Sequence, residues 1–156
     1  MTQKLSRLFG TYKRVPTLAD DSGIVHAILF AVNDAYRAAD LRDRCNIVLR
    51  FRQKLATLFQ TKFPDFPTDE HADTFASNMR SYSGRITPAA LRFIEIALKV
   101  NIALLHVPRE KLIRKIDYDF ADTIVLAWAD NWGVLVFADG SCILPPTHKG
   151  IVDRAL

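Results

Sequence analysis

The tetrapeptide Asp20-Asp21-Ser22-Gly23 stands directly before an apolar run, Ile24 to Val32, that only His26 interrupts. This pattern predicts a helix that is buried on most sides and capped by Asp21 or Ser22, because short polar side chains satisfy the free N–H groups of a first turn. A cysteine at such a helix start gains thiolate character from those N–H groups and from the helix dipole. Gly23 has that place here, so the helix is built to activate a nucleophile that the sequence does not supply.

The remaining residues that could do chemistry are dispersed. The two cysteines and the four histidines have no short paired spacing, so the sequence predicts no metal site and no cofactor. His26 is interpreted as a hydrogen-bonded residue of the core or cleft rather than as a base. Ser22 is interpreted as a helix cap rather than as a nucleophile. Cys45 lies on the apolar side of a predicted helix, which favours a reduced core thiol.

The elements that would position these residues follow a simple order of helices first and strands after. Apolar spacing and helix-start signals, such as Thr87-Pro88, predict four helices, over residues 22–38, 41–59, 68–82 and 87–100. Short apolar runs and the hairpin turn Asp139-Gly140 predict strands over residues 102–107, 122–128, 133–137 and 141–144. This order favours an α+β fold in which a helical N-terminal two-thirds packs on a small C-terminal sheet.

Length and composition fit one soluble domain. The chain has 156 residues, and we expect residues 1–18 to be an N-terminal arm and residues 19–156 a single domain. No apolar run approaches the roughly 20 residues that a membrane helix needs. The net charge is +4, but the basic residues are dispersed, and their two denser zones, over residues 42–54 and 109–115, do not interleave aromatic side chains in the manner of a stacking platform. This distribution predicts no specific nucleic-acid binding.

Residues 16–138 resemble the ovarian-tumour (OTU) family of cysteine peptidases. In that family the nucleophile lies in a motif like Asp-Gly-Asn/Ser-Cys-Leu-Phe-His/Arg-Ala, and the matching residues here read Asp20-Asp21-Ser22-Gly23-Ile24-Val25-His26-Ala27. The continuation through Val32, with Tyr36 and Arg42, is most similar to OTU-like proteins of large DNA viruses. The resemblance implies the α+β fold of papain-like cysteine peptidases.

The departures from the family pattern concern its catalytic residues. The family carries its base in a turn that corresponds to Asn131-Trp132-Gly133, and here that turn has no imidazole. The resemblance therefore implies a pseudoenzyme whose degenerate catalytic positions are Gly23, Asn131 and Trp132. Trp132 could stand exposed as an anchor for a partner, but the favoured interpretation is that it fills the former cleft, because Gly23 opposite leaves room for the ring to lean inward. The candidate binding residues are Asp20, Asp21, Ser22, His26 and Trp132.

A second stretch of the sequence matches the nucleophile motif, namely Asp139-Gly140-Ser141-Cys142-Ile143-Leu144. The hairpin interpretation accounts for this segment better, because Pro145-Pro146 prevents a helix from extending beyond Cys142. The match is therefore interpreted as accidental.

Taken with the resemblance, the sequence predicts a catalytically inactive, OTU-like binding or structural protein, of viral source. Its partner would be a ubiquitin-like protein or a viral assembly component. The alternatives are an engineered inactive form of an active deubiquitinase and a minor structural protein of the virion. Two cysteines cannot form a disulfide framework, so the expected compartment is reducing, either the host cytoplasm or the virion.

Overall fold

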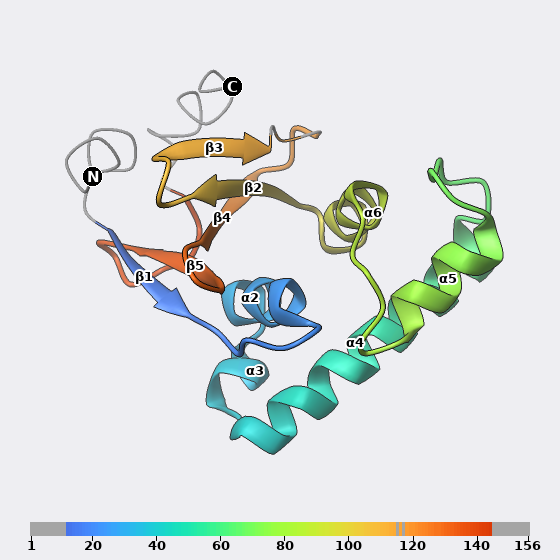
Figure 1. The fold of residues 1–156 in the computed structure, drawn as a ribbon, viewed down its shortest axis with the longest axis horizontal. Helices are drawn as coiled ribbons and strands as arrows, with labels where there is room; N and C mark the ends of the chain where they lie inside the picture. The colour runs from blue at the N-terminus through green and yellow to red at the C-terminus, as the bar shows by residue number, and fades with distance from the viewer. Residues whose placement is uncertain (1–11, 115, 117, 145–156) are drawn as a thin grey trace.

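The computed structural model describes residues 12–114, 116 and 118–144, and Figure 1 shows how the elements are arranged. Helices fill the first part of the described chain and most strands follow them, which confirms the predicted α+β class. The helices are α2 (Gly23–Val32), α3 (Asp34–Ala38), α4 (Leu41–Lys62), α5 (Ala72–Arg80) and α6 (Pro88–Leu98). The strands are β1 (Tyr12–Pro16), β2 (Val100–His106), β3 (Lys111–Arg114), β4 (Asp122–Trp128) and β5 (Trp132–Phe137).

The five strands form one mixed sheet in the order β1-β5-β4-β2-β3. The central strand β4 is parallel to β2, and all other neighbouring pairs are antiparallel. Alternate residues of a strand point to opposite faces, and here both faces are buried. Ile102 and Ile124 pack into the cluster that the helices share, whereas Ala103 and Val125 belong to a second apolar cluster.

Helix α2 lies against β4 and β5 and is covered on its other side by α3 and α4 (Figure 1). Because it is enclosed in this way, Val25, Ala27 and Ile28 are fully buried, as the nearly uninterrupted apolar run predicts. Two of the following helices begin at standard caps. The Asp40 side chain accepts from Asp43 N–H at the start of α4, and Thr87 accepts from Ala90 N–H at the start of α6. No described helix is long and apolar enough to cross a membrane.

The N-terminal half differs from the sequence prediction in two places. The helix predicted over residues 22–38 is two helices, because Asn33 has an extended backbone and its side chain caps α3 by accepting from Tyr36 N–H. Residues Tyr12–Pro16, predicted to be part of an arm, form the edge strand β1 paired with β5. Residues 1–11 of that predicted arm lie outside the described part of the chain.

The C-terminal part differs as well. The edge strand β3 was not predicted, because only four residues form it and they lack a long apolar pattern. The turn at Asp139-Gly140 is present, with Gly140 at φ +82°. The return strand predicted over residues 141–144 is wrong, because Ile143 makes a single bridge to Ile124 of β4 and does not pair with β5. Pro145-Pro146 lies outside the described residues.

Candidate functional site

An open cleft of about 830 Å³ lies between the start of α2, the start of α6 and strands β2 to β5. Its lining combines a broad apolar surface with charges of both signs. The apolar part comes mainly from Leu91, Leu104, Ile113, Trp128 and Trp132. The charged part comes from Asp20, Asp21, Arg85, Arg92 and Arg114. Ile113 is 47% exposed and adds an accessible apolar side chain to the lining.

The turn that leads into α2 is held by Asp20. Its Oδ1 accepts from Ser22 N–H at 2.9 Å, and its backbone carbonyl accepts from Gly23 N–H at 3.0 Å. Ser22 has the N-cap position, but its side chain makes no capping bond and its hydroxyl donates to the Tyr82 carbonyl. The predicted side-chain cap by Asp21 or Ser22 is therefore wrong. Asp21 is exposed and lines the cleft.

Gly23 is buried at the first position of α2. A Cβ at Gly23 would lie 3.4 Å from the Leu18 carbonyl oxygen and 3.8 Å from Trp132 Cδ1. Both are ordinary van der Waals distances, so the surroundings of Gly23 leave room for a Cβ. Trp132 is half-buried and packs edge-on against Trp128, with ring centroids 5.6 Å apart, while the cleft stays open beside it. The Trp132 ring therefore lies against the start of α2 at Gly23 and also lines the open cleft.

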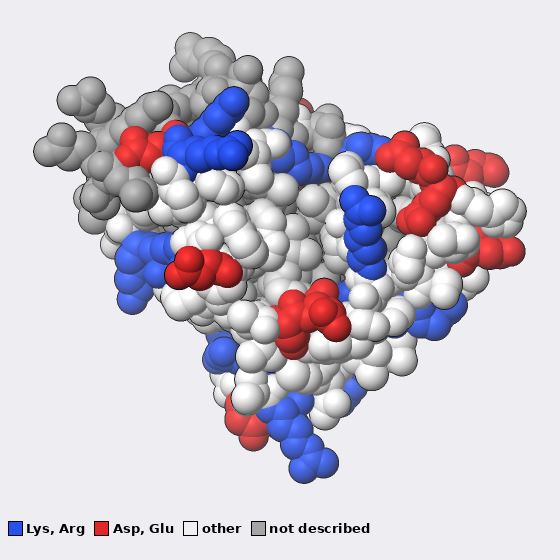
Figure 2. All heavy atoms as spheres, viewed as in Figure 1, with Lys and Arg blue, Asp and Glu red and all other residues white. Residues whose placement is uncertain are grey.

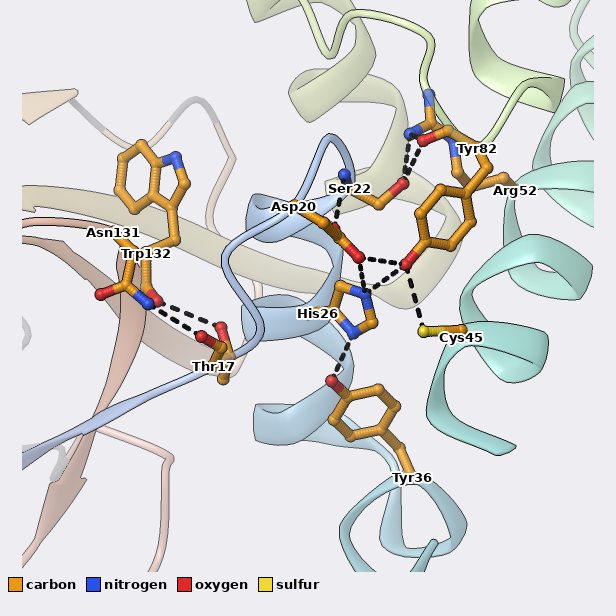
Figure 3. Close-up of polar contacts among 10 residues, drawn as sticks. All are labelled: Thr17, Asp20, Ser22, His26, Tyr36, Cys45, Arg52, Tyr82, Asn131 and Trp132. Atoms are coloured by element: carbon orange, nitrogen blue, oxygen red, sulfur yellow. Dashed lines mark hydrogen bonds and ion pairs between the residues drawn. The ribbon is translucent and has the colours of Figure 1, made fainter. Parts of the chain in front are cut away.

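Asn131 faces the chain that enters α2, as Figure 3 shows. Its Nδ2 donates to the Thr17 carbonyl at 2.8 Å, and its Oδ1 accepts from Arg14 Nη2 at 3.0 Å. Thr17 in turn donates through its hydroxyl to the Trp132 carbonyl at 3.1 Å. These bonds join the β4–β5 turn to the segment before α2. Asn131 therefore acts as a structural tie in this arrangement.

A polar cluster, which we call the buried polar cluster because His26 and Tyr36 at its centre are buried, lies beside the start of α2 (Figure 3). It also includes the half-buried Cys45 and Tyr82 and the exposed Asp20. His26 is fully buried, with Nδ1 2.5 Å from the Tyr36 hydroxyl and Nε2 2.7 Å from the Tyr82 hydroxyl. This confirms the interpretation of His26 as a hydrogen-bonded residue. Burial lowers the pKa of His26 below its usual value and raises the pKa of Tyr36 to about 12, so both side chains are predominantly uncharged at neutral pH.

The polar cluster brings a thiol, an imidazole and a carboxylate together, but not in the order of a catalytic triad. In a triad one ring nitrogen faces the nucleophile and the other faces the carboxylate. Here His26 Nε2 lies 3.3 Å from Asp20 Oδ2, while Nδ1 contacts Tyr36 and the Tyr82 hydroxyl lies against both Nε2 and Cys45 Sγ. Neither His26 nor Cys45 belongs to the lining of the cleft.

Arg52 fixes the loop that carries Tyr82. The guanidinium is fully buried and donates only to uncharged acceptors: Met79 O, Ser22 Oγ, Tyr82 O, Asn78 O and Gly84 O, at 2.6–2.9 Å. Burial lowers its pKa to about 10, so it is still protonated at neutral pH. One side chain thus joins α4, the α5–α6 loop and the residue before α2.

Sequence reasoning grouped some of these residues correctly and missed others. Asp20, Asp21, Gly23 and Trp132 do meet at one cleft, whereas Ser22 and His26 face the buried side of α2. The structural role of Arg52 was missed, although a signal exists. The residues Leu41, Cys45, Val48, Arg52, Leu55 and Phe59 follow alternating spacings of four and three, which places Arg52 on the buried face of α4. Nothing in the local sequence marks Tyr82.

The fold is similar to that of OTU domains among solved structures. One, described as an OTU domain in complex with ubiquitin, has a TM-score of 0.63 and 17% identity, and the match covers 94% of this chain and 87% of that one. A second, the OTU domain of OTUD1, has a TM-score of 0.62 and 14% identity, with 86% and 93% covered. No protein-family model and no curated protein matches the sequence. The likeness confirms the OTU-like fold that the sequence resemblance implied, and at these identities it concerns the fold alone.

Proposed function

We propose that this chain binds a ubiquitin-type protein in the cleft at the start of α2 and does not cleave it. The observation that carries the proposal is an open cleft beside a helix start whose first residue, Gly23, has no side chain. The fold supports the choice of partner, because a solved OTU domain with a similar fold is in complex with ubiquitin.

The lack of cleavage follows from the groups around the cleft. Peptide cleavage by an OTU-type mechanism needs a thiolate and a base that accepts its proton. Gly23 offers no thiol, and the indole N–H of Trp132 is a donor that accepts no proton. The two described cysteines do not substitute for the thiol, because Cys45 lies outside the cleft and Cys142 is buried with a raised pKa.

The lining of the cleft suits an extended polypeptide. Ile113, Trp128 and Trp132 offer apolar and aromatic surface, the type of surface that dominates binding energy at protein interfaces. Acidic side chains from the α2 turn and basic side chains from α6 and β3 flank that surface. A bound chain that carries both apolar and charged side chains would therefore find a complement for each.

A purely structural role, for instance in a virion, has less support. Exposed apolar patches away from the cleft would favour it. Among the described residues, the large exposed apolar side chains outside the cleft are Leu41 and Phe63, at opposite ends of α4. Single exposed side chains of this kind are ordinary on a protein surface. The free thiols of Cys45 and Cys142 agree with the reducing compartment, host cytoplasm or virion, that we propose.

Specific nucleic-acid binding is not part of the proposal. On the face drawn in Figure 2, basic and acidic side chains of the described residues are interspersed, and no continuous basic stripe crosses it. We expect only the weak, salt-dependent affinity of a mildly basic protein, about 10⁻⁴–10⁻⁶ M at physiological salt. A sequence-selective complex of submicromolar affinity in a filter-binding assay would contradict this expectation.

The proposal is tested by titrating labelled ubiquitin with the purified chain and with the variant Ile113→Asp. Ile113→Asp places a charge on the cleft surface and should abolish the interaction, because Ile113 is exposed in the free protein and its replacement leaves the core intact. Leu41→Asp, an exposed leucine on α4, is the matched control and should bind as the unaltered chain does. Equal affinities for the two variants would contradict docking in the cleft.

The second half of the proposal is tested by incubating the chain with ubiquitin dimers of defined linkage. The dimers should remain intact over hours. Cleavage that a thiol-alkylating reagent abolishes would contradict the proposal and point to Cys142 or Cys45.

A further inference from the structure

Three potential metal ligands converge in the buried polar cluster, although they are distant in the sequence. Asp20 Oδ2, His26 Nε2 and Cys45 Sγ all lie within 4.8 Å of one another. They come from the turn before α2, from α2 and from α4. The 3.3 Å distance between Asp20 Oδ2 and His26 Nε2 agrees with tetrahedral zinc, whose ligands at about 2.0–2.3 Å from the metal are roughly 3.3–3.6 Å apart.

The Tyr82 hydroxyl marks the point at which these three side chains meet. It lies 2.5 Å from Asp20 Oδ2, 2.7 Å from His26 Nε2 and 3.5 Å from Cys45 Sγ (Figure 3). One hydroxyl carries one proton, so it can donate to only one of these three groups at a time. A metal ion that took the place of this hydroxyl would satisfy all three lone pairs at once, with the Tyr82 side chain turned aside and a water completing the tetrahedron.

The surroundings fit a metal site in two further respects. The other ring nitrogen of His26, Nδ1, is engaged by the Tyr36 hydroxyl at 2.5 Å, which fixes the ring and directs Nε2 at the cluster. Metal-bound histidines are commonly held in this way by a partner on their second nitrogen. The Asp20 carboxylate and a Cys45 thiolate together carry two negative charges, which would neutralise a divalent cation, and the exposed Asp20 leaves the site a path to solvent.

We propose that Asp20, His26 and Cys45 form a zinc site that joins the turn before α2 to α4. The mixed oxygen, nitrogen and sulfur ligands suit Zn²⁺ better than Mg²⁺ or Ca²⁺, which prefer oxygen alone. This inference does not rest on ubiquitin binding. The ion would brace the rear wall of the turn whose front face borders the cleft. The site runs against the sequence-based prediction of no metal site, because the three residues come together only in the fold and have no motif spacing.

Binding would exchange a proton for the metal. The Cys45 thiol loses its proton to the buffer and becomes a thiolate, while the neutral His26 keeps its single ring proton on Nδ1, toward the Tyr36 hydroxyl, and coordinates through Nε2. No oxidation or reduction takes place. The proposal therefore predicts two measurable quantities: a fixed number of zinc ions bound per chain, and the release of a proton as zinc binds.

The test uses the full chain, stripped with a chelator and titrated with ZnCl₂ by calorimetry in two buffers of different protonation enthalpy. We expect one equivalent of zinc, a buffer-dependent heat from proton release and a higher melting temperature with zinc. Co²⁺ in place of zinc should give the charge-transfer absorption of a cobalt–thiolate bond. The proposal would be overturned if zinc binding did not saturate at one equivalent. It would also be overturned if bound Co²⁺ showed no cobalt–thiolate absorption.

Single substitutions decide which residues hold the ion. Cys45→Ser and Asp20→Asn should each weaken zinc binding by at least ~100-fold, the upper end of the loss for residues that only support ligands. Cys142→Ser is the matched control, because it removes the other described thiol and should leave zinc affinity unchanged. If Cys45→Ser fails to fold, Cys45→Ala replaces it, and circular dichroism of the metal-free proteins establishes that each variant is folded. Equal zinc affinity in Cys45→Ser and Cys142→Ser would refute the site.

Discussion

The two sides of the turn before α2 differ in how tightly they are held. On the buried side, the polar cluster and Arg52 form a network in which His26, Tyr82 and Arg52 each contact two or more partners. On the cleft side, the Trp132 ring lies close to Gly23, and both residues border open space in the cleft. Asp20 belongs to both sides, since it contacts His26 and Tyr82 and also lines the cleft.

The difference has a thermodynamic cause. A buried polar group that loses its partner costs about 1–3 kcal/mol, so a network of such groups resists substitution. A side chain that borders an open cleft carries no such penalty, because water can replace its contacts. The buried side is therefore constrained by stability, and the cleft side is constrained only by what it binds. A protein can lose the chemistry of such a cleft and keep its fold.

The largest effect should come from Arg52→Met. Methionine removes the guanidinium that donates to four backbone carbonyls and to the Ser22 hydroxyl, and among those carbonyls the Tyr82 carbonyl keeps the Ser22 hydroxyl as a donor. We expect the free energy of unfolding to fall by about 3–5 kcal/mol. Urea denaturation followed by circular dichroism measures this loss.

The matched control for that change is Arg50→Met, an exposed arginine on the same helix. Its effect should stay within about 0.5 kcal/mol. If both variants lost the same stability, the contrast between a constrained buried side and a tolerant surface would be wrong.

A smaller effect is expected for Trp132→Ala, which addresses the cleft side. As a half-buried anchor, Trp132 should contribute more to partner binding than to folding. We expect ubiquitin affinity to fall by roughly 30-fold, equivalent to about 2 kcal/mol for an interface hot spot. The free energy of unfolding should fall by less than the 3–5 kcal/mol that is typical when a large aromatic core residue is truncated.

Calorimetry with ubiquitin and urea denaturation separate these two quantities. Phe63→Ala, which truncates an exposed aromatic residue at the far end of α4, should leave ubiquitin affinity unchanged. A loss of stability of 3 kcal/mol or more in Trp132→Ala with no change in affinity would make the indole a plug, the other hypothesis drawn from the sequence.

The fold was more predictable from the sequence than the site, for a physical reason. Helix starts are encoded within a few residues, as Thr87-Pro88 illustrates, and long apolar runs identify α2, β2 and β4. The break at Asn33 and the pairing of β1 with β5 depend on contacts between distant segments and were missed. The polar cluster also depends on contacts between distant segments, because Tyr82 and Asp20 are 62 residues apart in the sequence.

Trp132 is a single-residue example of a contact that the sequence does not predict. Its sequence position indicated the cleft, but whether the ring filled the space or bordered it depended on Trp128. The packing of Trp128 against Trp132 is a side-chain arrangement that periodicity does not encode.

The smallest effects should come from restoring a side chain at Gly23. A Cβ fits there at 3.4 and 3.8 Å from its neighbours, so Gly23→Ala and Gly23→Cys should both fold, with stability changed by less than about 1 kcal/mol. Gly23→Cys gains a thiol at a helix start but no base, and Asn131 is already engaged with Thr17 and Arg14. We therefore expect no cleavage of ubiquitin dimers by Gly23→Cys, and Gly23→Ala is the control with the same Cβ and no thiol.

Adding Trp132→His to Gly23→Cys supplies an imidazole, but Val134 and Leu135 beyond it provide no carboxylate to orient the ring. The double variant should show faster alkylation by iodoacetamide than Gly23→Cys, without turnover of ubiquitin dimers. Turnover by Gly23→Cys alone would mean that the cleft still holds a working base. The cleft side would then lack only the thiol of the nucleophile. Its difference from the buried side would come from a single residue, Gly23.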